Sequence, residues 1–333
     1  MLKKKVPYRN KIIFLSILSA LLLIAVLIWS VLSGQYPLTI HDLMSGEERS
    51  LMVLKRLRIP RTFMGLIGGF GLGISGFLYQ MIFKNPLASP DIVGVSSGSS
   101  AGAAFAIVLF SSFAPIVSVT AFIGGMLALS VTMLVSYLVP GKNSYTIVLA
   151  GIAIHSVAQT VLMLLKLTAD PEKQLASIEY WMMGSLNGVS VDSLYSPLVI
   201  TVLGFLTALF LFRQLQILSF HEEEAVSLGV NVTLLRFLLL AVATLMVSSI
   251  LCVTGIISFI GLLAPHAARL LTGRNDLASF TFSGLIGGII MTISDILARI
   301  VSSAELPVSI FTSLLGAPLL IFLLVKANRK EVS

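Results

Sequence analysis

Long runs of apolar residues, interrupted by short polar connections, repeat along almost the whole chain. About 20 apolar residues in a helix cross the roughly 30 Å hydrocarbon layer of a membrane, and a helix satisfies every backbone polar group internally. The runs are uniformly apolar, whereas the strands of a membrane barrel would alternate in polarity. The pattern predicts an all-α polytopic membrane protein, folded as a single transmembrane domain over residues 1–333. Ten spans are predicted at 12–33, 62–83, 92–110, 115–139, 144–165, 193–212, 234–252, 254–271, 278–297 and 306–325.

Two boundaries between predicted spans are inferred from length, because no charged residue marks them. The stretch 92–141 is uncharged over 50 residues, so it must fold back, and a turn is expected at 111–115. The stretch 237–268 has no Asp, Glu, Lys or Arg, and a break is expected near 252–255. Without this second break the chain would have nine spans, and its C-terminus would lie on the other side of the membrane.

The first apolar run is expected to stay in the mature protein. It extends from Ile12 to Ser33, about 22 residues, whereas the apolar region of a secretory signal has 7–15. It also lacks a clean small-x-small cleavage site before polar sequence. We therefore interpret it as a retained first span.

The distribution of Lys and Arg predicts which side of the membrane each connection faces. With the N-terminus in the cytoplasm, the inner segments hold 14 of these cations and the outer segments hold 8. Cytoplasmic connections are enriched in Lys and Arg, so this orientation, with both termini cytoplasmic, is favoured. Five of the eight outer cations lie in the loop 34–61, four of them in the segment KRLRIPR at 55–61. Topology does not explain this cluster, so a binding role on the outer face becomes the better hypothesis.

The composition limits the class of protein. The sequence is 56% hydrophobic and 11% charged, against about 25% charged residues in a soluble domain. Membrane topology explains the net charge of +7, which needs no nucleic-acid partner. A single cysteine excludes an internal disulfide and a Cys-based metal cluster. No Walker A, H-E-x-x-H or G-x-S-x-G motif occurs, so we expect no catalytic residue, no metal site, and an energy source in a partner or an ion gradient.

Glycines recur at a spacing of four residues within the predicted spans. Gly71, Gly73 and Gly76 match the letters of a dinucleotide-binding fingerprint, but they lie inside an apolar span and do not follow a strand. Small residues four apart allow helix backbones to approach closely in a membrane. We therefore expect close helix packing at Gly69 and Gly73, at Gly284 and Gly288, and at Gly94, Gly98 and Gly102.

Ionisable residues inside the predicted spans are few, and they are functional candidates because charge is costly in lipid. His155 lies near the middle of the fifth span, whereas His266 and Asp295 lie near span ends. No span has a carboxylate at its centre, which argues against a proton- or sodium-coupled transporter. His155 either lines a pathway or packs in a hydrogen-bonded site.

Two polar connections are long enough to hold short helices. The inner loop 214–236 carries the acidic residues 222–224, which suit a helix N-terminus, and Gly229 suits the end of that helix. This loop is either a solvated connector or a docking helix for a cytoplasmic partner. The outer loop 167–192 carries Trp181 followed by two methionines, which suits a helix lying at the lipid headgroups.

Several segments together resemble one protein family. They are LRIPR, SGFLYQMIFKNPLASPDIVGVSSGSSAGA, YWMMGSL, LGVNV, GIISFIGLLAPHAARLLTG, SDILAR and ELPVSIFTSLLGAPLLIFLL. In this order they are similar to the FecCD-type transmembrane permeases of binding-protein-dependent ABC importers for iron–siderophore complexes, haem and vitamin B12. The resemblance covers residues 10–328. It implies the type II ABC importer permease fold, with ten transmembrane helices, in the bacterial cytoplasmic membrane.

The resemblance also implies partners. A second permease subunit, either an identical copy or a close paralogue, would complete the pathway within the lipid bilayer. Two cytoplasmic ATPase subunits would bind ATP and Mg, so no cofactor is expected on this chain. A substrate-binding protein would dock on the outer face.

Roles are implied residue by residue on three surfaces. Outer-face arginines would meet acidic residues of the binding protein, because a planar guanidinium can hold a carboxylate through two bonds. The inner loop would contact the ATPase, and the fifth span with the turn before it would form the gate and the pathway. The implied residues are Arg56, Arg58, Arg61 and Arg299 for binding-protein docking, Glu223, Glu224, Ala225, Leu228 and Gly229 for ATPase coupling, and Asn143, Ser144, His155 and Gln159 for the gate and pathway.

The implied mechanism is alternating access driven by ATP in the partner, with specificity mainly in the binding protein. An iron(III)–siderophore complex is the leading substrate, and haem, vitamin B12 or molybdate are alternatives within the same family. Outside the family, the alternative is an ion-coupled secondary transporter. An intramembrane enzyme is disfavoured because the sequence offers no nucleophile–base pair.

Overall fold

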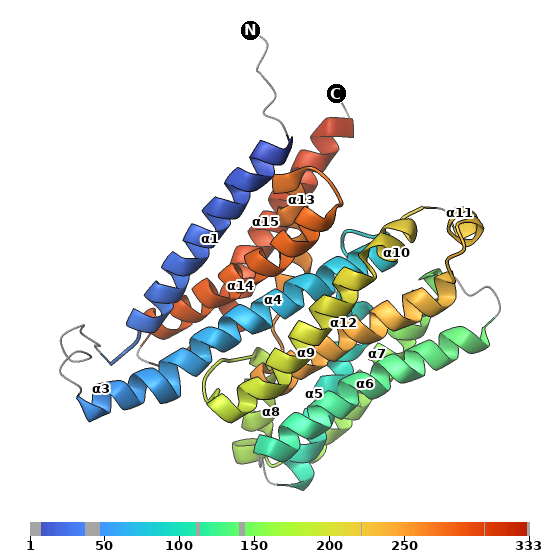
Figure 1. Ribbon diagram of the computed structural model, residues 1–333. Coiled ribbons are helices and arrows are strands. Elements are labelled where there is room, and N and C mark those ends of the chain that lie inside the picture. Colours follow the sequence, from blue (N-terminus) through green and yellow to red (C-terminus); the bar gives the residue numbers. More distant parts are fainter. Residues whose placement is uncertain are drawn as a thin grey trace.

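In the computed structural model the chain folds into long helices joined by short connections, with no strand among the residues described (Figure 1). The structure describes residues 8–331 apart from 37–46, 111–113, 140–143, 221 and 303. The longer helices are α1 (Tyr8–Leu32), α4 (Ile59–Ile82), α5 (Val95–Leu109), α6 (Ala114–Leu138), α7 (Ser144–Thr168), α9 (Val191–Phe210), α12 (Val232–Thr254), α13 (Ile260–Thr272), α14 (Leu277–Ile300) and α15 (Val308–Glu331). The shorter elements are α3 (Glu48–Met52), η1 (Val53–Arg58), η2 (Pro90–Val93), η3 (Pro171–Leu175), α8 (Ala176–Met183), α10 (Phe212–Ile217) and α11 (Glu222–Ser227).

Each of the ten predicted spans contains a helix, in the predicted order. Seven helices in the described part of the chain are long and apolar enough to cross a membrane. α5 and α13 have 15 and 13 residues, fewer than the roughly 20 that a full crossing needs. The all-helical membrane fold is confirmed, whereas ten complete crossings stay a prediction.

The predicted break between α12 and α13 is confirmed. α12 ends at Thr254, and Gly255 follows with a φ of 69°, a conformation that favours glycine. Other elements satisfy the backbone groups that the break frees. The Ser185 N–H donates to the Thr254 carbonyl at 2.7 Å, and the Ser309 hydroxyl donates to the Ile256 carbonyl at 2.6 Å. Irregular backbone is tolerated at membrane depth where protein covers it in this way.

The first turn of α1 and the last turn of α15 lie at the same end of the bundle as α11, whereas α3 and α8 lie at the opposite end (Figure 1). We call these the α11 end and the α8 end. Contacts follow this division: Lys84 Nζ donates to the Phe220 carbonyl at the α11 end, and Gln35 Nε2 donates to the Ser302 carbonyl at 3.4 Å at the α8 end. Connections that were predicted to share one side of the membrane therefore lie together.

α4 is the most deeply buried of the candidate spans. Its glycines contact the backbones of α14 and α13. A Cβ added at Gly69 would lie 2.3 Å from the Gly287 carbonyl oxygen, and one at Gly76 would lie 1.7 Å from the Gly261 carbonyl oxygen. A Cβ at Gly73 would lie 2.2 Å from a carbonyl oxygen of α14. The close packing predicted for Gly69 and Gly73 is confirmed.

The other predicted glycine positions are also closely packed. A Cβ at Gly98 or Gly102 would lie 2.5 Å or 2.1 Å from a backbone oxygen of α6. At Gly284 and Gly288, side chains of α4 occupy the space that a Cβ would need. Gly94, with a φ of 78°, is needed for its backbone conformation as well as for packing on α7. Small residues thus set the helix contacts throughout the bundle.

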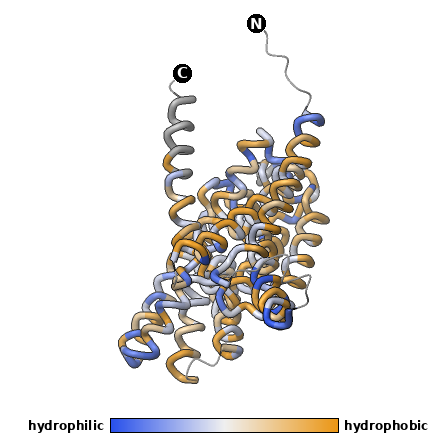
Figure 2. The backbone as a smooth tube through the Cα atoms, turned by 90° about the vertical axis from the view of Figure 1, so that its left-hand side faces the viewer, coloured by the Kyte–Doolittle hydropathy of each residue, from blue (hydrophilic) through white to orange (hydrophobic). Residues whose placement is uncertain are grey.

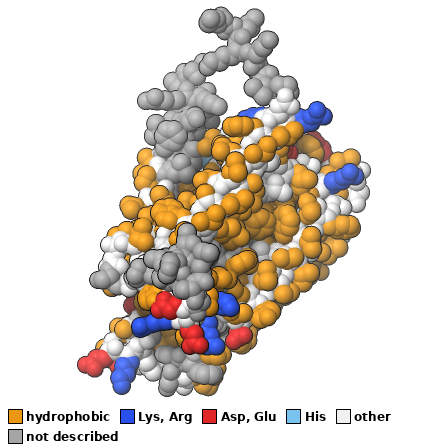
Figure 3. All heavy atoms as spheres, turned by 60° about the vertical axis from the view of Figure 1, so that its left-hand side comes forward, with side chains coloured by type: hydrophobic (Ala, Val, Ile, Leu, Met, Phe, Trp, Pro, Cys, Tyr) orange, Lys and Arg blue, Asp and Glu red, His pale blue; other side chains and the backbone are white. Residues whose placement is uncertain are grey.

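Apolar side chains cover the sides of the bundle. Figure 2 shows hydrophobic residues along the lengths of the helices, and Figure 3 shows Lys, Arg, Asp and Glu gathered towards the ends of one face. On α1, for example, Phe14, Leu21 and Ile28 are more than half exposed. Such an extended apolar surface is typical of a protein embedded in lipid.

We expect Gly76→Ala to destabilise the protein by about 1–3 kcal/mol, the usual cost of overpacking, because two backbones must separate to admit a methyl group. Gly68→Ala is the matched control, since its Cβ would meet side-chain atoms alone, the flexible end of Met291 at 3.2 Å and a methyl group of Ile250 at 3.4 Å. The melting temperature (Tm) of the purified protein in detergent measures the difference. Equal Tm values for the two variants would contradict the backbone contact.

Candidate functional site

The four arginines predicted to dock a binding protein do not share one environment. Arg56 is exposed, whereas Arg58 and Arg61 are only 5% and 7% exposed. Arg299 of α14 is 4% exposed, and Asp295, one turn before it, is fully buried. Four charged side chains therefore gather inside the protein at the α8 end.

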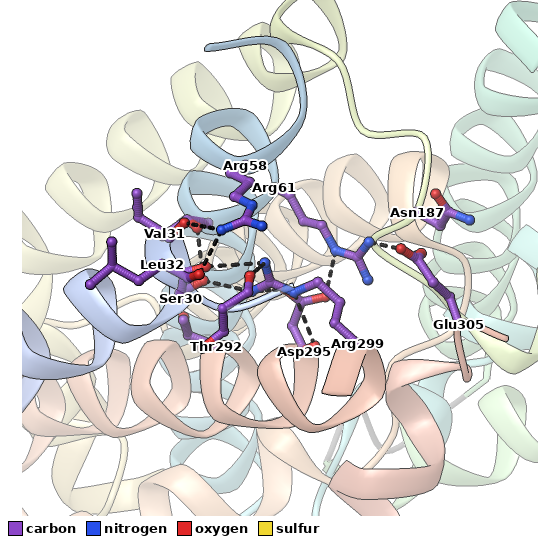
Figure 4. Close-up of polar contacts among 12 residues, drawn as sticks. Ser30, Val31, Leu32, Arg58, Arg61, Asn187, Thr292, Asp295, Arg299 and Glu305 are labelled. Atoms are coloured by element: carbon purple, nitrogen blue, oxygen red, sulfur yellow. Dashed lines mark hydrogen bonds and ion pairs between the residues drawn. The ribbon is translucent and has the colours of Figure 1, made fainter. Parts of the chain in front are cut away.

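Two carboxylates pair with Arg61 and Arg299 of this cluster (Figure 4). Arg61 Nε donates to Asp295 Oδ1 at 2.8 Å, and Arg61 Nη1 donates to Glu305 Oε2 at 2.8 Å. Arg299 Nη2 lies 3.0 Å from Asp295 Oδ2. Asp295 thus bridges one cation from α4 and one from its own helix. Removing one partner of such a buried set is costly, because it leaves a charge without compensation.

The guanidinium groups of Arg58 and Arg299 also bind the end of α1. Arg58 Nη1 donates to the carbonyls of Val31 and Leu32 at 2.8 Å and 2.6 Å. Arg299 donates to the Ser30 carbonyl at 3.1 Å and to the Ser30 hydroxyl at 2.8 Å. The last carbonyls of a helix lack partners within the helix and form the negative end of its dipole. These arginines therefore cap α1 and attach it to η1, which leads directly into α4, and to α14.

The docking role implied by the sequence needs arginine side chains that a partner can reach, but those of Arg58, Arg61 and Arg299 are buried. These guanidinium groups have acceptors within their own chain, namely the end of α1 and two carboxylates. Arg56 alone among the four keeps an exposed side chain. The docking role of the arginines stays a prediction. The sequence did signal one contact, because Asp295 and Arg299 lie four residues apart on one helix face, but nothing in the sequence marked Glu305.

α11 ends at Ser227, and Gly229 stops the helix, as the sequence predicts. Gly229 has a φ of 80°, its N–H donates to the Val226 carbonyl at 2.9 Å, and the Val230 N–H donates to the Ala225 carbonyl at 3.1 Å. These two bonds form a Schellman motif, which stops a helix at a left-handed glycine. Ala225 is buried, whereas Leu228 is 62% exposed. A small residue thus anchors α11, and a large apolar side chain points away from the protein.

Some predicted residues lie at the limits of the described structure. Asn143 lies outside the described residues. Ser144 begins α7 and Glu223 belongs to α11, but their side chains lie outside the described part. Glu224 is exposed on α11.

His155 and Gln159 lie one turn apart on α7 and are both partly exposed. The connection between α4 and α5 reaches the middle of this helix. A Cβ added at Gly94 would lie 3.3 Å from the His155 backbone nitrogen, and one at Gly151 would lie 1.9 Å from the Ile92 carbonyl oxygen. The structure therefore places the predicted pathway helix against η2, a contact that the sequence did not indicate.

Two cavities were also not indicated by the sequence. A cavity of about 650 Å³ at the α8 end is lined by Tyr180 and Trp181 of α8 and by Cys252 of α12. A cavity of about 220 Å³ lies between the α4–α5 connection, including Ser89 and Asp91, and the break between α12 and α13.

A family model described as the FecCD transport family matches residues 22–326, most of the chain. The chain belongs to this family. The ferric enterobactin transport permease FepG of Escherichia coli is 32% identical to this FecCD chain, over 91% of this chain and 93% of FepG. The cobalamin import permease BtuC of Halobacterium salinarum is 35% identical, over 83% of this chain and 74% of BtuC.

A solved structure gives the same result for the fold. An inward-facing metal-chelate type ABC transporter matches with a TM-score of 0.86 at 32% identity, covering 92% of this chain and 97% of that one. The FecCD chain is thus a membrane-embedded permease of an ABC importer, from a family of transport permeases rather than catalytic subunits. The fold and the family implied by the sequence motifs are confirmed.

We expect Asp295→Asn to lower the stability of this FecCD permease by about 3–5 kcal/mol, because Arg61 and Arg299 stay buried without their shared carboxylate. Lys166→Gln is the control. It breaks the Lys166–Glu179 pair, 2.8 Å apart, whose side chains are 25% and 47% exposed. That exposed pair should contribute at most about 1 kcal/mol. Unfolding in detergent compares the two, and an equally small loss for Asp295→Asn would count against a structural role of the cluster.

Proposed function

We propose that this chain is the membrane-spanning permease subunit of an ATP-driven, binding-protein-dependent importer for iron(III)–siderophore complexes. The observation that carries the proposal is α11, a short helix anchored by Ala225 that presents Leu228 and Val226, each 62% exposed. Exposed apolar side chains at a polar end of the molecule are typical of a surface that a partner covers. This favours a docking helix over a solvated connector.

The partner proposed for α11 is a separate ATPase subunit, present twice in the complex. The chain has no Walker A motif, so ATP and Mg are proposed to bind to the ATPase, and no cofactor is assigned to this chain. Closure of the ATPase dimer would move α11 and switch the permease between inward- and outward-facing states.

The α11 end is proposed to face the cytoplasm of a bacterial inner membrane, with both termini on that side. The distribution of 14 inner and 8 outer cations supports this orientation. Three of the eight outer cations, Arg58, Arg61 and Arg299, are buried and bound within the chain. Because these three arginines bind acceptors within the chain, their position on the outer side has a structural reason. They are therefore weaker evidence against this orientation than cations without such contacts would be.

Two further partners complete the proposed importer. A second permease subunit, identical or closely related, would form the pathway together with this chain. A substrate-binding protein would dock at the α8 end, where Arg56 supplies an exposed cation and the buried cluster of Arg58, Arg61 and Arg299 holds its supporting helices in place.

The proposed substrate class follows from the relatives. FepG is named for ferric enterobactin, and the matching solved structure is of a metal-chelate type transporter. BtuC is named for cobalamin at a similar level of identity, so vitamin B12 is the main alternative, with haem and molybdate as others within the family.

Reconstitution in lipid vesicles with the ATPase and the binding protein tests the proposed function. We expect uptake of ferric enterobactin that requires ATP and does not follow a proton gradient. Competition by cobalamin, haem or molybdate would instead identify one of the alternative substrates. Uptake driven by a proton gradient without ATP would exclude the importer and favour a secondary transporter.

The same system tests α11. We expect Leu228→Asp to weaken association with the ATPase about tenfold or more, because a charge replaces an exposed apolar anchor. Met52→Asp is the matched control, since Met52 is 59% exposed at the opposite end. Co-purification of the ATPase measures both variants, and equal retention would refute docking at α11.

We expect Arg56→Glu to slow association of the binding protein about tenfold at low salt, with a smaller effect at high salt, because exposed charges act mainly through long-range attraction. The Tm should not change, since Arg56 is exposed. Arg61→Glu should lower the Tm instead, because Arg61 is paired with two carboxylates. An unaltered association rate for Arg56→Glu would exclude its docking role.

A further inference from the structure

Two helices that end near the α11 end use the same backbone motif with different residues. Gly229, two residues after the end of α11, adopts the left-handed conformation. Lys84 takes the equivalent position two residues after the end of α4, at a φ of 50°. The Lys84 N–H donates to the Met81 carbonyl at 3.3 Å, and the Asn85 N–H donates to the Gln80 carbonyl at 3.1 Å. A Schellman motif therefore carries lysine where glycine is usual.

A left-handed backbone strains every L side chain, and glycine would relieve the strain. A lysine can interact with the negative end of a helix from the last turn, without adopting this conformation. The Lys84 side chain instead leaves its own helix, and its Nζ donates to the carbonyl of Phe220 in the connection between α10 and α11. An observed outlier of this kind points to a use for the side chain.

The segment that follows Lys84 reaches the interior of the protein. Ser89 and Asp91 line the cavity of about 220 Å³ next to the α12–α13 break. Ile92 packs on Gly151 in the first half of α7, with so little space that a Cβ at Gly151 would lie 1.9 Å from the Ile92 carbonyl oxygen. A shift of this segment would therefore move the cavity wall and press on α7, because close-packed interiors transmit strain.

We propose that Lys84 is a coupling residue that ties the α10–α11 connection to the α4–α5 connection. A displacement of α11 is thereby transmitted to the cavity wall at Ser89 and Asp91. This inference rests on the proposed function, in which the ATPase docks on α11. Lys84 acts as a positioning residue, and its long flexible side chain with three rotatable donors can keep the contact while both segments move.

The test uses a cysteine reporter in the cavity wall. The chain has a single cysteine, so Cys252→Ser provides a background for Ser89→Cys. The complex with the ATPase is treated with a charged methanethiosulfonate reagent, once without nucleotide and once with ATP and vanadate. With Lys84 present we expect the labelling rate at residue 89 to change about fivefold or more between the two states, in the range of ordinary allosteric coupling.

Three substitutions separate coupling from stability. Lys84→Gly should abolish the nucleotide-dependent change while its Tm stays equal or rises, because glycine relieves the left-handed strain. Lys84→Met keeps that strain without the donor and should also abolish the change. Lys84→Arg should retain it.

Persistence of the change in Lys84→Gly, with the ATPase bound, would overturn the coupling role and leave the proposed function intact. Retention of the change in Lys84→Met would overturn it too, since the donor would then be dispensable. The coupling role would also be overturned if the complex with Lys84 present bound the ATPase but its labelling rate at residue 89 did not depend on nucleotide. Failure of Leu228→Asp to weaken ATPase association would instead count against the proposed function itself.

Discussion

Contact between backbones fixes the position of α4, and the rest of the structure depends on this contact. In lipid, burial of apolar surface does not favour one helix contact over another, so close fit at small residues decides. Gly69 places α4 against α14, and Gly76 places it against α13. With α4 fixed along its length, both of its ends have defined neighbours. Arg61 meets Asp295 at one end, and Lys84 meets the α10–α11 connection at the other.

α1 depends on polar contacts at both of its ends, because its sides are largely exposed. At the α8 end, Arg58 of η1 and Arg299 of α14 cap its last carbonyls. At the α11 end, the Tyr8 hydroxyl donates to Asp276, and the Arg274 guanidinium lies over the Tyr8 ring at 4.2 Å from its centre. The charged residues near the two ends of α1 therefore attach this helix to the rest of the bundle, in addition to any influence on membrane topology.

The helical fold and much of its packing could be predicted because they depend on short patterns in the sequence. Apolar runs marked the helices, and the spacing of Gly69 and Gly73 marked the contact between α4 and α14. The motifs identified the family and the end of α11 at Gly229. The environment of the arginines could not be predicted in the same way. Arg58 donates to two carbonyls of α1, 26 and 27 residues away, and to the Tyr36 carbonyl, and a carbonyl carries no signature in the sequence.

The same reason explains why two further features were not predicted from the sequence. Glu305 becomes a partner of Arg61 only after α4 and α14 have packed, since the two residues are separated by 244 positions. The left-handed conformation of Lys84 was also hidden, because lysine has no preference for it. Local patterns thus reveal the elements, whereas contacts between distant polar groups require the assembled bundle.

The break between α12 and α13 has a mechanical consequence. Just after α8, the Ser185 N–H donates to the Thr254 carbonyl at the end of α12. The first turn of α15 contacts both of these segments. The Val308 N–H donates to the Gly184 carbonyl, and the Ser309 hydroxyl donates to the Ile256 carbonyl. Hydrogen bonds therefore join three stretches of chain that are far apart in sequence. Two of the three bonds run between main-chain atoms and do not depend on side-chain identity. Any reorientation of α12 relative to α8 and α15 would have to break these bonds, whereas a connection without such cross-links resists displacement less.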